Sequence, residues 1–216
     1  MKDKLYKISN YKDMDPFLMT ITSADDHWMY LSSTGCLSAG RKKAEYALFP
    51  YVTDDLLHKN AHFTGPVTCV SAQQDNIEYL WLPFSNQIDS YKKEQSLYKN
   101  SLGNKIVFEE INHSLGLTFI YSWQASAEYG FIKKTKLINH SGKETNIKLV
   151  DGLRNILPAG VGLRTQQEMS NLANAYKVCE CDADYNYALY YMNALLMDKP
   201  DPGESLFSNI VWAYSE

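Results

Sequence analysis

Short runs of residues that favour β-strands follow one another along almost the whole chain. They are rich in β-branched and aromatic residues and are separated by clusters of Gly, Asn, Asp, Ser or Pro. The runs cover residues 5–8, 17–22, 28–32, 67–72, 77–82, 105–111, 117–123, 131–138, 145–150, 175–181, 187–195 and 206–212. Many short strands broken by turns are typical of a sandwich or a barrel. The sequence therefore predicts an all-β fold, either a sandwich or a barrel.

Only residues 164–175 have the pattern of a helix, with Met169, Leu172 and Ala173 roughly on one side and no proline inside. The 216 residues contain no internal repeat, no low-complexity run and no linker rich in Pro, Gly and Ser. One domain covering residues 1–216 is therefore expected. Because residues 207–214 still read as a strand, this domain is expected to be the amino-terminal part of a longer protein.

Two local patterns predict how strands are oriented and paired. Ile106, Phe108 and Glu110 alternate with Val107, Glu109 and Ile111, which predicts a strand with two different faces. Residues 139–143, Asn-His-Ser-Gly-Lys, have the polar, glycine-bearing composition of a hairpin loop. The strands on either side, residues 131–138 and 145–150, are therefore expected to pair with each other in antiparallel fashion.

The charge balance limits the classes of partner. The chain has 21 Lys and Arg against 25 Asp and Glu, a net charge of -4, and no long block of one sign. Nothing here favours a nucleic acid or an anionic membrane as a partner, so neutral or weakly charged ligands fit better. The amino-terminal residues mix charge signs and lack the apolar core of a signal peptide, so a cytoplasmic location is expected.

Four cysteines, Cys36, Cys69, Cys179 and Cys181, are too few in a chain of this length for a disulfide-built scaffold, so reduced thiols are expected. Cys179 and Cys181 lie two residues apart, which places both on the same face of a strand. They could bind a metal, or they could be two small apolar side chains of the core. No second Cys/His pair accompanies them, so the core interpretation is favoured.

The sequence contains no nucleophile elbow, phosphate-binding glycine loop, zinc protease helix or dinucleotide fingerprint. Adjacent carboxylates do occur, and they are Asp25 with Asp26, Asp54 with Asp55, and Glu109 with Glu110. Neighbouring residues on a strand face opposite ways, whereas glycosidases need two carboxyl groups that converge on one bond. No catalytic residue, metal or cofactor is therefore predicted.

Residues 35–55 crowd glycines, an arginine, aromatic residues and carboxylates into a segment without a usable period, and a shaped loop is expected there. Within it, Arg41 could bind a sugar hydroxyl or a phosphate, or it could tie the loop down by pairing with Asp54 or Asp55. The structural ion pair is the favoured interpretation. Downstream, His58 and His62 could share a helix face and a metal, but Gly65-Pro66 would end any helix, so a capped turn is favoured.

Aromatic residues are abundant, with 16 tyrosines and four tryptophans. An exposed aromatic ring can stack on the apolar face of a sugar, while the same rings also fill the cores of sandwiches. For a single ring such as Trp81, packing in the core is the favoured interpretation.

Six segments together resemble the beginning of the large cellobiose phosphorylase-like carbohydrate enzymes. They are residues 35–41 (Gly-Cys-Leu-Ser-Ala-Gly-Arg), 47–55 (Ala-Leu-Phe-Pro-Tyr-Val-Thr-Asp-Asp), 62–65 (His-Phe-Thr-Gly), 81–84 (Trp-Leu-Pro-Phe), 139–144 (Asn-His-Ser-Gly-Lys-Glu) and 151–158 (Asp-Gly-Leu-Arg-Asn-Ile-Leu-Pro). The resemblance runs from about residue 25 to the end. It implies an antiparallel β-supersandwich of two layers, of the galactose mutarotase type, which in this family precedes helical linkers and an α/α barrel that holds the active site.

The resemblance further implies a non-catalytic amino-terminal domain of a glycoside phosphorylase or hydrolase. Such a domain packs on the catalytic barrel of the same longer chain, helps to shape its site for an oligosaccharide, and often takes part in a homodimer. The acid that protonates the leaving oxygen belongs to the barrel. The residues that the resemblance places in the loop meeting the barrel or the substrate are Arg41, Asp54, Asp55, His62 and Thr64. The chain is shorter than the usual sandwich of the family, which leaves open whether the final strands are present.

Two other functions remain open. A stand-alone aldose mutarotase would use a glutamate base and a histidine acid across the sugar. Residues 112–114 and 139–141, both Asn-His-Ser, are similar to the Asn-His segment of aldose epimerases, but the sequence after each departs from that pattern. A glycan-binding module would instead hold a sugar through tyrosines on a concave sheet, without chemistry.

Overall fold

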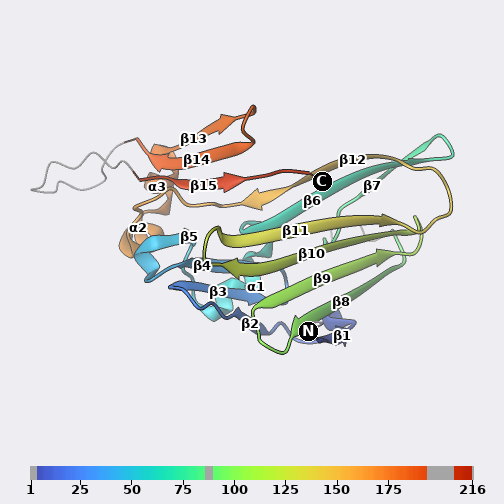
Figure 1. Ribbon diagram of the computed structural model, residues 1–216, viewed down its shortest axis with the longest axis horizontal. Helices are drawn as coiled ribbons and strands as arrows, with labels where there is room; N and C mark the ends of the chain where they lie inside the picture. The colour runs from blue at the N-terminus through green and yellow to red at the C-terminus, as the bar shows by residue number, and fades with distance from the viewer. Residues whose placement is uncertain (1–3, 86–89, 194–206, 216) are drawn as a thin grey trace, which may run out of the picture.

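The computed structural model describes residues 4–85, 90–193 and 207–215 (Figure 1). Its largest sheet, sheet A, has the strand order β1-β8-β9-β10-β11. Its strands are β1 (Leu5–Ser9), β8 (Lys93–Asn100), β9 (Lys105–Asn112), β10 (Leu117–Ser126) and β11 (Gly130–Asn139). All strand pairs of this sheet are antiparallel.

Three smaller antiparallel sheets complete the β-structure of the described residues. Sheet B contains β2 (Leu18–Ile21), β3 (His27–Ser32), β4 (Leu37–Arg41) and β5 (Ala47–Phe49) in that order. Sheet C has the order β12-β6-β7, with β12 (Asn146–Arg154), β6 (Gly65–Gln74) and β7 (Ile77–Trp81). Sheet D contains β13 (Lys177–Asp182), β14 (Tyr187–Met192) and β15 (Asn209–Trp212).

Short helices connect these sheets. The α-helices are α1 (Asp54–Lys59), α2 (Leu163–Glu168) and α3 (Ser170–Tyr176), and the 3₁₀ helices are η1 (Tyr11–Asp13), η2 (Ala44–Tyr46) and η3 (Asn60–His62). None of the helices in the described ranges is long and apolar enough to cross a membrane.

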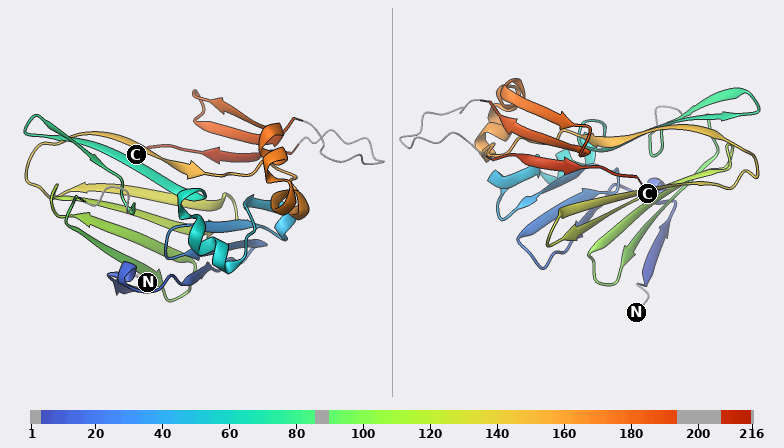
Figure 2. Two further views of the ribbon diagram at one scale, coloured as in Figure 1. Left: turned by 180° about the vertical axis from the view of Figure 1, so that it is seen from behind. Right: turned by 45° about the horizontal axis from the view of Figure 1, so that its top comes forward.

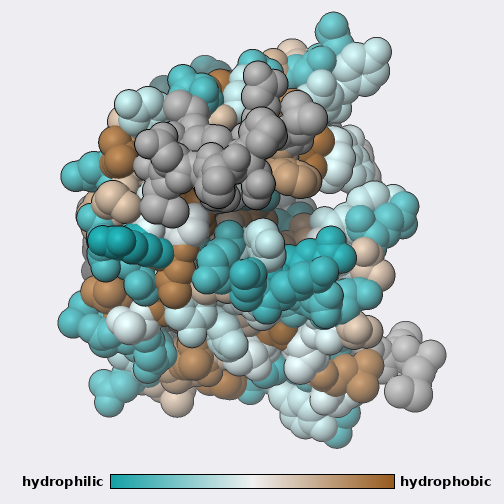
Figure 3. Space-filling model, turned by 90° about the vertical axis from the view of Figure 1, so that its left-hand side faces the viewer, coloured by the Kyte–Doolittle hydropathy of each residue, from teal (hydrophilic) through white to brown (hydrophobic). Residues whose placement is uncertain are grey.

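On the side of the molecule that carries α2 and α3, hydrophobic residues occur in small groups among hydrophilic ones (Figure 3).

Sheets B and C pack against the same face of sheet A. Ile106, Phe108, Phe119 and Trp123 belong to that face because they are paired or alternate in register on β9 and β10. The Trp123 ring meets Phe49 of sheet B with 6.4 Å between ring centroids, and the Phe119 ring meets Trp81 of sheet C at 6.5 Å. One layer is therefore sheet A, and the other is formed by sheets B and C (Figures 1 and 2).

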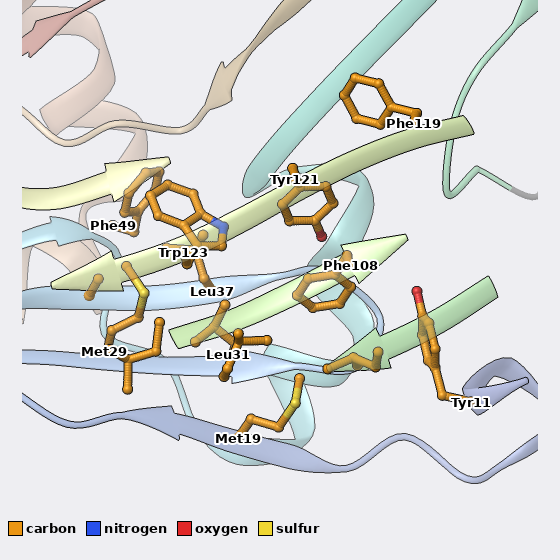
Figure 4. Packing of buried hydrophobic residues seen from close by; sticks show 14 of the residues in the cluster. Tyr11, Met19, Met29, Leu31, Leu37, Phe49, Phe108, Phe119, Tyr121 and Trp123 are labelled. Atoms are coloured by element: carbon orange, nitrogen blue, oxygen red, sulfur yellow. The ribbon is translucent and has the colours of Figure 1, made fainter. Parts of the chain in front are cut away.

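The core between these layers is continuous and contains mainly large side chains from sheets A, B and C. Figure 4 shows those of sheets A and B packed against one another. Phe119, Leu37 and Phe49 are fully buried, and Trp81 is 1% exposed. The alternation predicted for β9 is confirmed, since Ile106, Phe108 and Glu110 are buried while their neighbours are half-buried. The all-β antiparallel sandwich that the sequence predicts is therefore confirmed, as is the core position of Trp81.

The predicted strands recur with small shifts of their ends, although the runs 187–195 and 206–212 extend into residues outside the described part. The predicted helix over 164–175 is divided in two at Met169, whose φ of −136° and ψ of 35° interrupt the helix. The shaped loop expected over residues 35–55 is wrong in large part. Residues 37–41 and 47–49 form β4 and β5, and α1 begins at Asp54, because sheet B and the core select an extended backbone that small residues tolerate.

The hairpin predicted around residues 139–143 is also wrong. β11 pairs with β10 in sheet A, whereas β12 pairs with β6 in sheet C. The connection is instead an arch between the two layers. Its polar residues act as expected of a turn, because the Asn139 side chain accepts from the backbone N–H of Ser141 at 2.9 Å and donates to the Lys143 carbonyl at 2.8 Å. The arch is held against the β9–β10 turn by the backbone N–H of His140, which donates to the Gly116 carbonyl.

Candidate functional site

A pocket of about 150 Å³ lies where segments of all the core layers converge. Its wall is formed by the β3–β4 turn at residues 34–35, the end of η3 and the start of β6 at residues 61–68, and residues 82–85 after β7. Tyr121 of β10 and Arg154 at the end of β12 complete it. These segments are far apart in the sequence, and they meet because sheets B and C cover the same face of sheet A.

Tyr121 forms the inner side of this pocket. It is 3% exposed, its ring stacks on Phe108 with centroids 4.7 Å apart, and Phe84 meets it edge-on at 5.1 Å. Burial raises the pKa of Tyr121 well above its ordinary value, so the phenol is neutral at physiological pH. Among the described residues its hydroxyl has no hydrogen-bond partner, while the turn at Gly35, whose φ is 96°, lies close to it. This hydroxyl is therefore available to a ligand.

Arg154 provides the charge of the pocket. One Nη donates to the His62 carbonyl at 2.6 Å, and the other donates to the carbonyls of Ala61 at 2.8 Å and Pro66 at 3.1 Å. Within the described ranges no carboxylate forms an ion pair with this guanidinium. Burial lowers the pKa of Arg154, but an arginine remains protonated at neutral pH. A positive charge without an acidic partner therefore lies beside His62.

A buried ion pair lies next to the pocket and joins the two layers. The Lys133 amine of β11 donates to both carboxylate oxygens of Asp151 on β12, at 2.7 and 2.6 Å. Thr68, which lines the pocket, donates to the same carboxylate at 2.6 Å, and the Lys133 amine lies 5.8 Å from the centre of the Tyr121 ring. Burial lowers the pKa of Lys133, and the charge of Asp151 partly counteracts this. The pair is neutral overall, so Arg154 leaves a net positive charge in this region.

Glu110 holds the part of the pocket wall that residues 82–85 form. Its side chain is fully buried on β9. One carboxylate oxygen accepts from the Trp81 indole N–H at 2.7 Å, and the other accepts from the Phe84 backbone N–H at 2.6 Å and from the Gln95 side-chain amide. Phe84 has a φ of 63°, which is unusual for a residue with a side chain. The three hydrogen bonds therefore hold residues 82–85 in a conformation that the sequence alone would not favour.

The five residues predicted for the site are divided between two places. His62 lines the pocket, and Thr64 is buried beside it, where its hydroxyl accepts from the Asn155 side chain at 2.9 Å. Arg41, Asp54 and Asp55 do not line it. Arg41 is exposed at the end of β4, and Asp54 and Asp55 occupy the first turn of α1.

The expected ion pair of Arg41 with Asp54 or Asp55 is wrong. Both carboxylates instead pair within α1, Asp54 with His58 at 3.4 Å and Asp55 with Lys59 at 3.9 Å, because residues four apart are neighbours on a helix. The His58 ring also forms a hydrogen bond with the Ser32 hydroxyl at 2.8 Å. His58 and His62 do not share one helix face as the metal interpretation required, since His58 lies in α1 and His62 ends the 3₁₀ helix η3 that follows it.

Sequence reasoning missed Tyr121, Arg154 and Thr68. Tyr121 and Thr68 lie on predicted strands, whereas Arg154 lies beyond the predicted run 145–150, at the end of β12. A strand pattern shows only which face a residue occupies, and these residues come together through the packing of two layers. In this small, mostly apolar cavity the Tyr121 hydroxyl and the Arg154 guanidinium can bind a ligand, whereas the Thr68 hydroxyl already donates its proton to Asp151.

A scan against protein-family models finds no match for this chain, and a search of curated protein sequences finds none either. The function is therefore argued from the site.

Proposed function

We propose that the chain is a non-catalytic, amino-terminal β-sandwich domain of a carbohydrate-active enzyme of the glycoside phosphorylase or hydrolase kind. The observation that carries this proposal is the pocket around Tyr121 and Arg154. It combines, as far as the described residues show, a buried phenol whose hydroxyl has no partner, a guanidinium without an acidic partner, and the ring of His62. Such a set can hydrogen-bond the hydroxyl groups of a sugar.

The size of the pocket favours a small ligand group. Its volume of about 150 Å³ is below the roughly 300–1,000 Å³ that pockets for drug-sized ligands have. It therefore suits one sugar unit of an oligosaccharide, or a substituent on that unit. Because Arg154 leaves the pocket positive, a sugar that carries a carboxylate or a phosphate is expected to bind more tightly than its neutral counterpart.

The composition of the pocket wall favours binding over catalysis. Glycoside cleavage requires a carboxylic acid at the scissile bond, and the described residues that line this pocket include no Asp or Glu. The same observation weighs against the alternative of a stand-alone mutarotase, which would require a glutamate opposite a histidine. His62 is present in the wall, but none of the described lining residues across from it is a glutamate.

An apolar patch on the outer face of sheet C supports the packing of this domain on further polypeptide. Val67, Leu80 and Val150 are 38, 49 and 70% exposed, and the half-buried Cys69 pairs with Val150 in register. These residues lie on one face of three neighbouring strands. Contiguous apolar surface of this kind is typical of a contact with another domain, which in the proposed enzyme is the α/α barrel.

Chemical-shift perturbation in ¹H–¹⁵N NMR spectra of the full chain tests the proposal. Glucose, cellobiose and glucuronate are added in turn as probes. We expect saturable shifts that cluster at residues 34–35, 61–68, 82–85, Tyr121 and Arg154, strongest for glucuronate. His62→Ala should weaken binding several-fold without affecting the Arg154 bonds, which go to backbone carbonyls. His140→Ala, in the exposed arch, is the matched control. Shifts that cluster elsewhere, or no shift with any of the three sugars, would contradict the proposal.

A further inference from the structure

Cys179 and Cys181 form a pair of exposed thiols at the edge of sheet D, where the sequence favoured two core residues. Their Sγ atoms are 3.8 Å apart on one face of β13. Glu180, between them, points to the opposite face and accepts a hydrogen bond from the Tyr191 hydroxyl at 2.6 Å. The core prediction is wrong because β13 is an edge strand that no other layer covers, so its small side chains remain accessible.

The distance between the two sulfur atoms fits a shared metal ion. Thiolates bind Zn²⁺ at about 2.3 Å in tetrahedral geometry, which places two coordinating sulfur atoms about 3.8 Å apart. The observed separation has this value before any ion is bound. Little side-chain movement is therefore needed for both sulfur atoms to coordinate one ion.

A disulfide between the same residues is less favourable. Residues two apart on a strand have Cα atoms about 6.7 Å apart, near the upper limit of about 6.8 Å for disulfides. The sulfur atoms would also have to approach to about 2.05 Å. Bond formation would therefore bend β13 away from β14, whereas metal coordination leaves the strand pairing intact.

The surroundings of the pair leave room for further ligands. Cys181 borders an open cavity of about 310 Å³ that is also lined by Ala188, Val211 and Ala213. The Lys177 amine is engaged elsewhere, since it donates to the Ile156 carbonyl. Asp182 follows Cys181 directly on β13 and so faces the other side of the strand, where its carboxylate accepts from the backbone N–H groups of Asp184 and Tyr185.

We infer that Cys179 and Cys181 form a two-thiolate site for a thiophilic metal ion that prefers tetrahedral coordination, such as Zn²⁺. On binding, each thiol loses its proton to solvent and forms one sulfur–metal bond, with no change of oxidation state. In the described part of the chain no third His, Cys, Asp or Glu joins the two thiols. The two remaining coordination positions are filled by water or by a small ligand entering from the open cavity.

Titration of the fully reduced, metal-free chain with Co²⁺ tests this site, because thiolate–cobalt bonds give charge-transfer absorption. We expect one Co²⁺ per chain, displacement by Zn²⁺, and an affinity that rises from about pH 6 to about pH 8 because the thiols must lose protons. Cys179→Ser and Cys181→Ser should each weaken binding at least tenfold. Cys69→Ser, which removes the half-buried thiol of β6, should leave binding unchanged.

Because both thiols are exposed, the serine variants are expected to fold, and circular dichroism verifies this. The inference is overturned if the reduced wild-type chain shows no charge-transfer band, or if the double variant Cys179→Ser/Cys181→Ser binds Co²⁺ as wild type does. It is also overturned if mild oxidation converts the pair completely to a disulfide while the reduced chain binds no metal.

Discussion

Two regions of the molecule differ in how far their side chains are buried. One is the sandwich of sheets A, B and C, and the other is the small sheet D. In the sandwich, β9 and β10 carry fully buried side chains such as Ile106 and Phe119. In sheet D, every described residue of β13, β14 and β15 is half-buried or exposed. Sheet D is joined to the segment before α2 by few hydrogen bonds, among them Asn209 to the Leu157 carbonyl at 2.8 Å and the Ala159 N–H to the Tyr190 carbonyl at 3.2 Å.

This difference separates the parts of the molecule that determine stability from those that are free to vary. Burial of large apolar side chains is the main favourable term in folding, and it is concentrated in the sandwich. Sheet D depends on strand pairing and on partial burial of side chains such as Tyr190 and Val211. Polar and reactive groups, including the two thiols, can therefore be exposed on sheet D with little cost to the free energy of unfolding.

The strongest test of this comparison uses one tryptophan from each region. Trp123→Ala should lower the free energy of unfolding by about 3–5 kcal/mol, because the side chain is 2% exposed and its removal leaves a cavity. Trp212→Ala, in sheet D, removes a side chain that is 54% exposed and should cost less than about 0.5 kcal/mol. Urea denaturation of both variants provides the values. Equal losses would show that sheet D contributes to stability as much as the core does.

The next largest effect is expected at Glu110. Glu110→Ala leaves the donors of Trp81, Phe84 and Gln95 without their acceptor. The free energy of unfolding should therefore fall by about 3–4 kcal/mol. The adjacent Glu109 is a matched control, because its half-buried carboxylate accepts one hydrogen bond, from the Tyr98 hydroxyl, within the described part of the chain. Glu109→Ala should cost less than about 1 kcal/mol. If both variants lower the free energy of unfolding by the same amount, Glu110 does not hold the pocket wall as described.

A smaller effect, with a dependence on pH, is expected at the ion pair between the layers. Asp151→Asn leaves Lys133 buried without its counterion and should cost about 2–3 kcal/mol at neutral pH. The pKa of Lys133, already lowered by burial, should fall further. Below the ordinary lysine pKa the unfolded chain then binds more protons than the folded one, so the unfolding free energy of the variant rises with pH.

Denaturation at a series of pH values from about 7 to about 9.5 measures this recovery. Above about pH 10 the buried Tyr11 and Tyr121 reverse the trend, because burial raises their pKa and the folded chain then holds more protons. The exposed pair Asp75–Lys143 is the control, and Asp75→Asn should change stability by less than about 1 kcal/mol. A loss in Asp151→Asn that does not vary with pH would contradict a charged Lys133 as its cause.

No effect at all is expected in a test for catalysis. The purified chain, given cellobiose and inorganic phosphate, should release no sugar phosphate, because the described residues that line the pocket include no carboxylic acid. Magnetisation-exchange NMR on glucose should likewise show no acceleration of anomer exchange. Phosphorolysis by the chain alone would contradict this prediction, because either the sandwich or sheet D would then have to contain a complete active site.

The sequence predicted the strands of the sandwich well where apolar and polar residues alternate, as on β9. It missed β8, whose residues 93–100 are mostly polar, because that strand is stabilised by its position between β1 and β9 rather than by its own propensity. The pairing of β11 with β12 was wrong for a related reason. The composition of residues 139–143 determines that the chain turns, but which strand accepts β12 depends on the packing of the whole sandwich.

The candidate site was predictable only in part. His62 was identified through the family resemblance of residues 62–65, and it does line the pocket. Tyr121 and Arg154 meet it through contacts between distant strands, which neither spacing nor periodicity reveals. The expected role of Arg41 failed because a helix at residues 54–59 pairs the two aspartates internally.

The arch between β11 and β12 also has a consequence for the time course of folding. Thr68 and Asp151, which meet across β6 and β12, are 83 residues apart in the chain. During synthesis the edge of β6 that pairs with β12 stays unpaired until β8, β9, β10 and β11 of sheet A have been made. Closing so long a loop costs conformational entropy before the contacts between β6 and β12 can offset it. Assembly of sheet C is therefore expected to be the slow step. Until it is complete, that edge is the part of the nascent chain most exposed to aggregation.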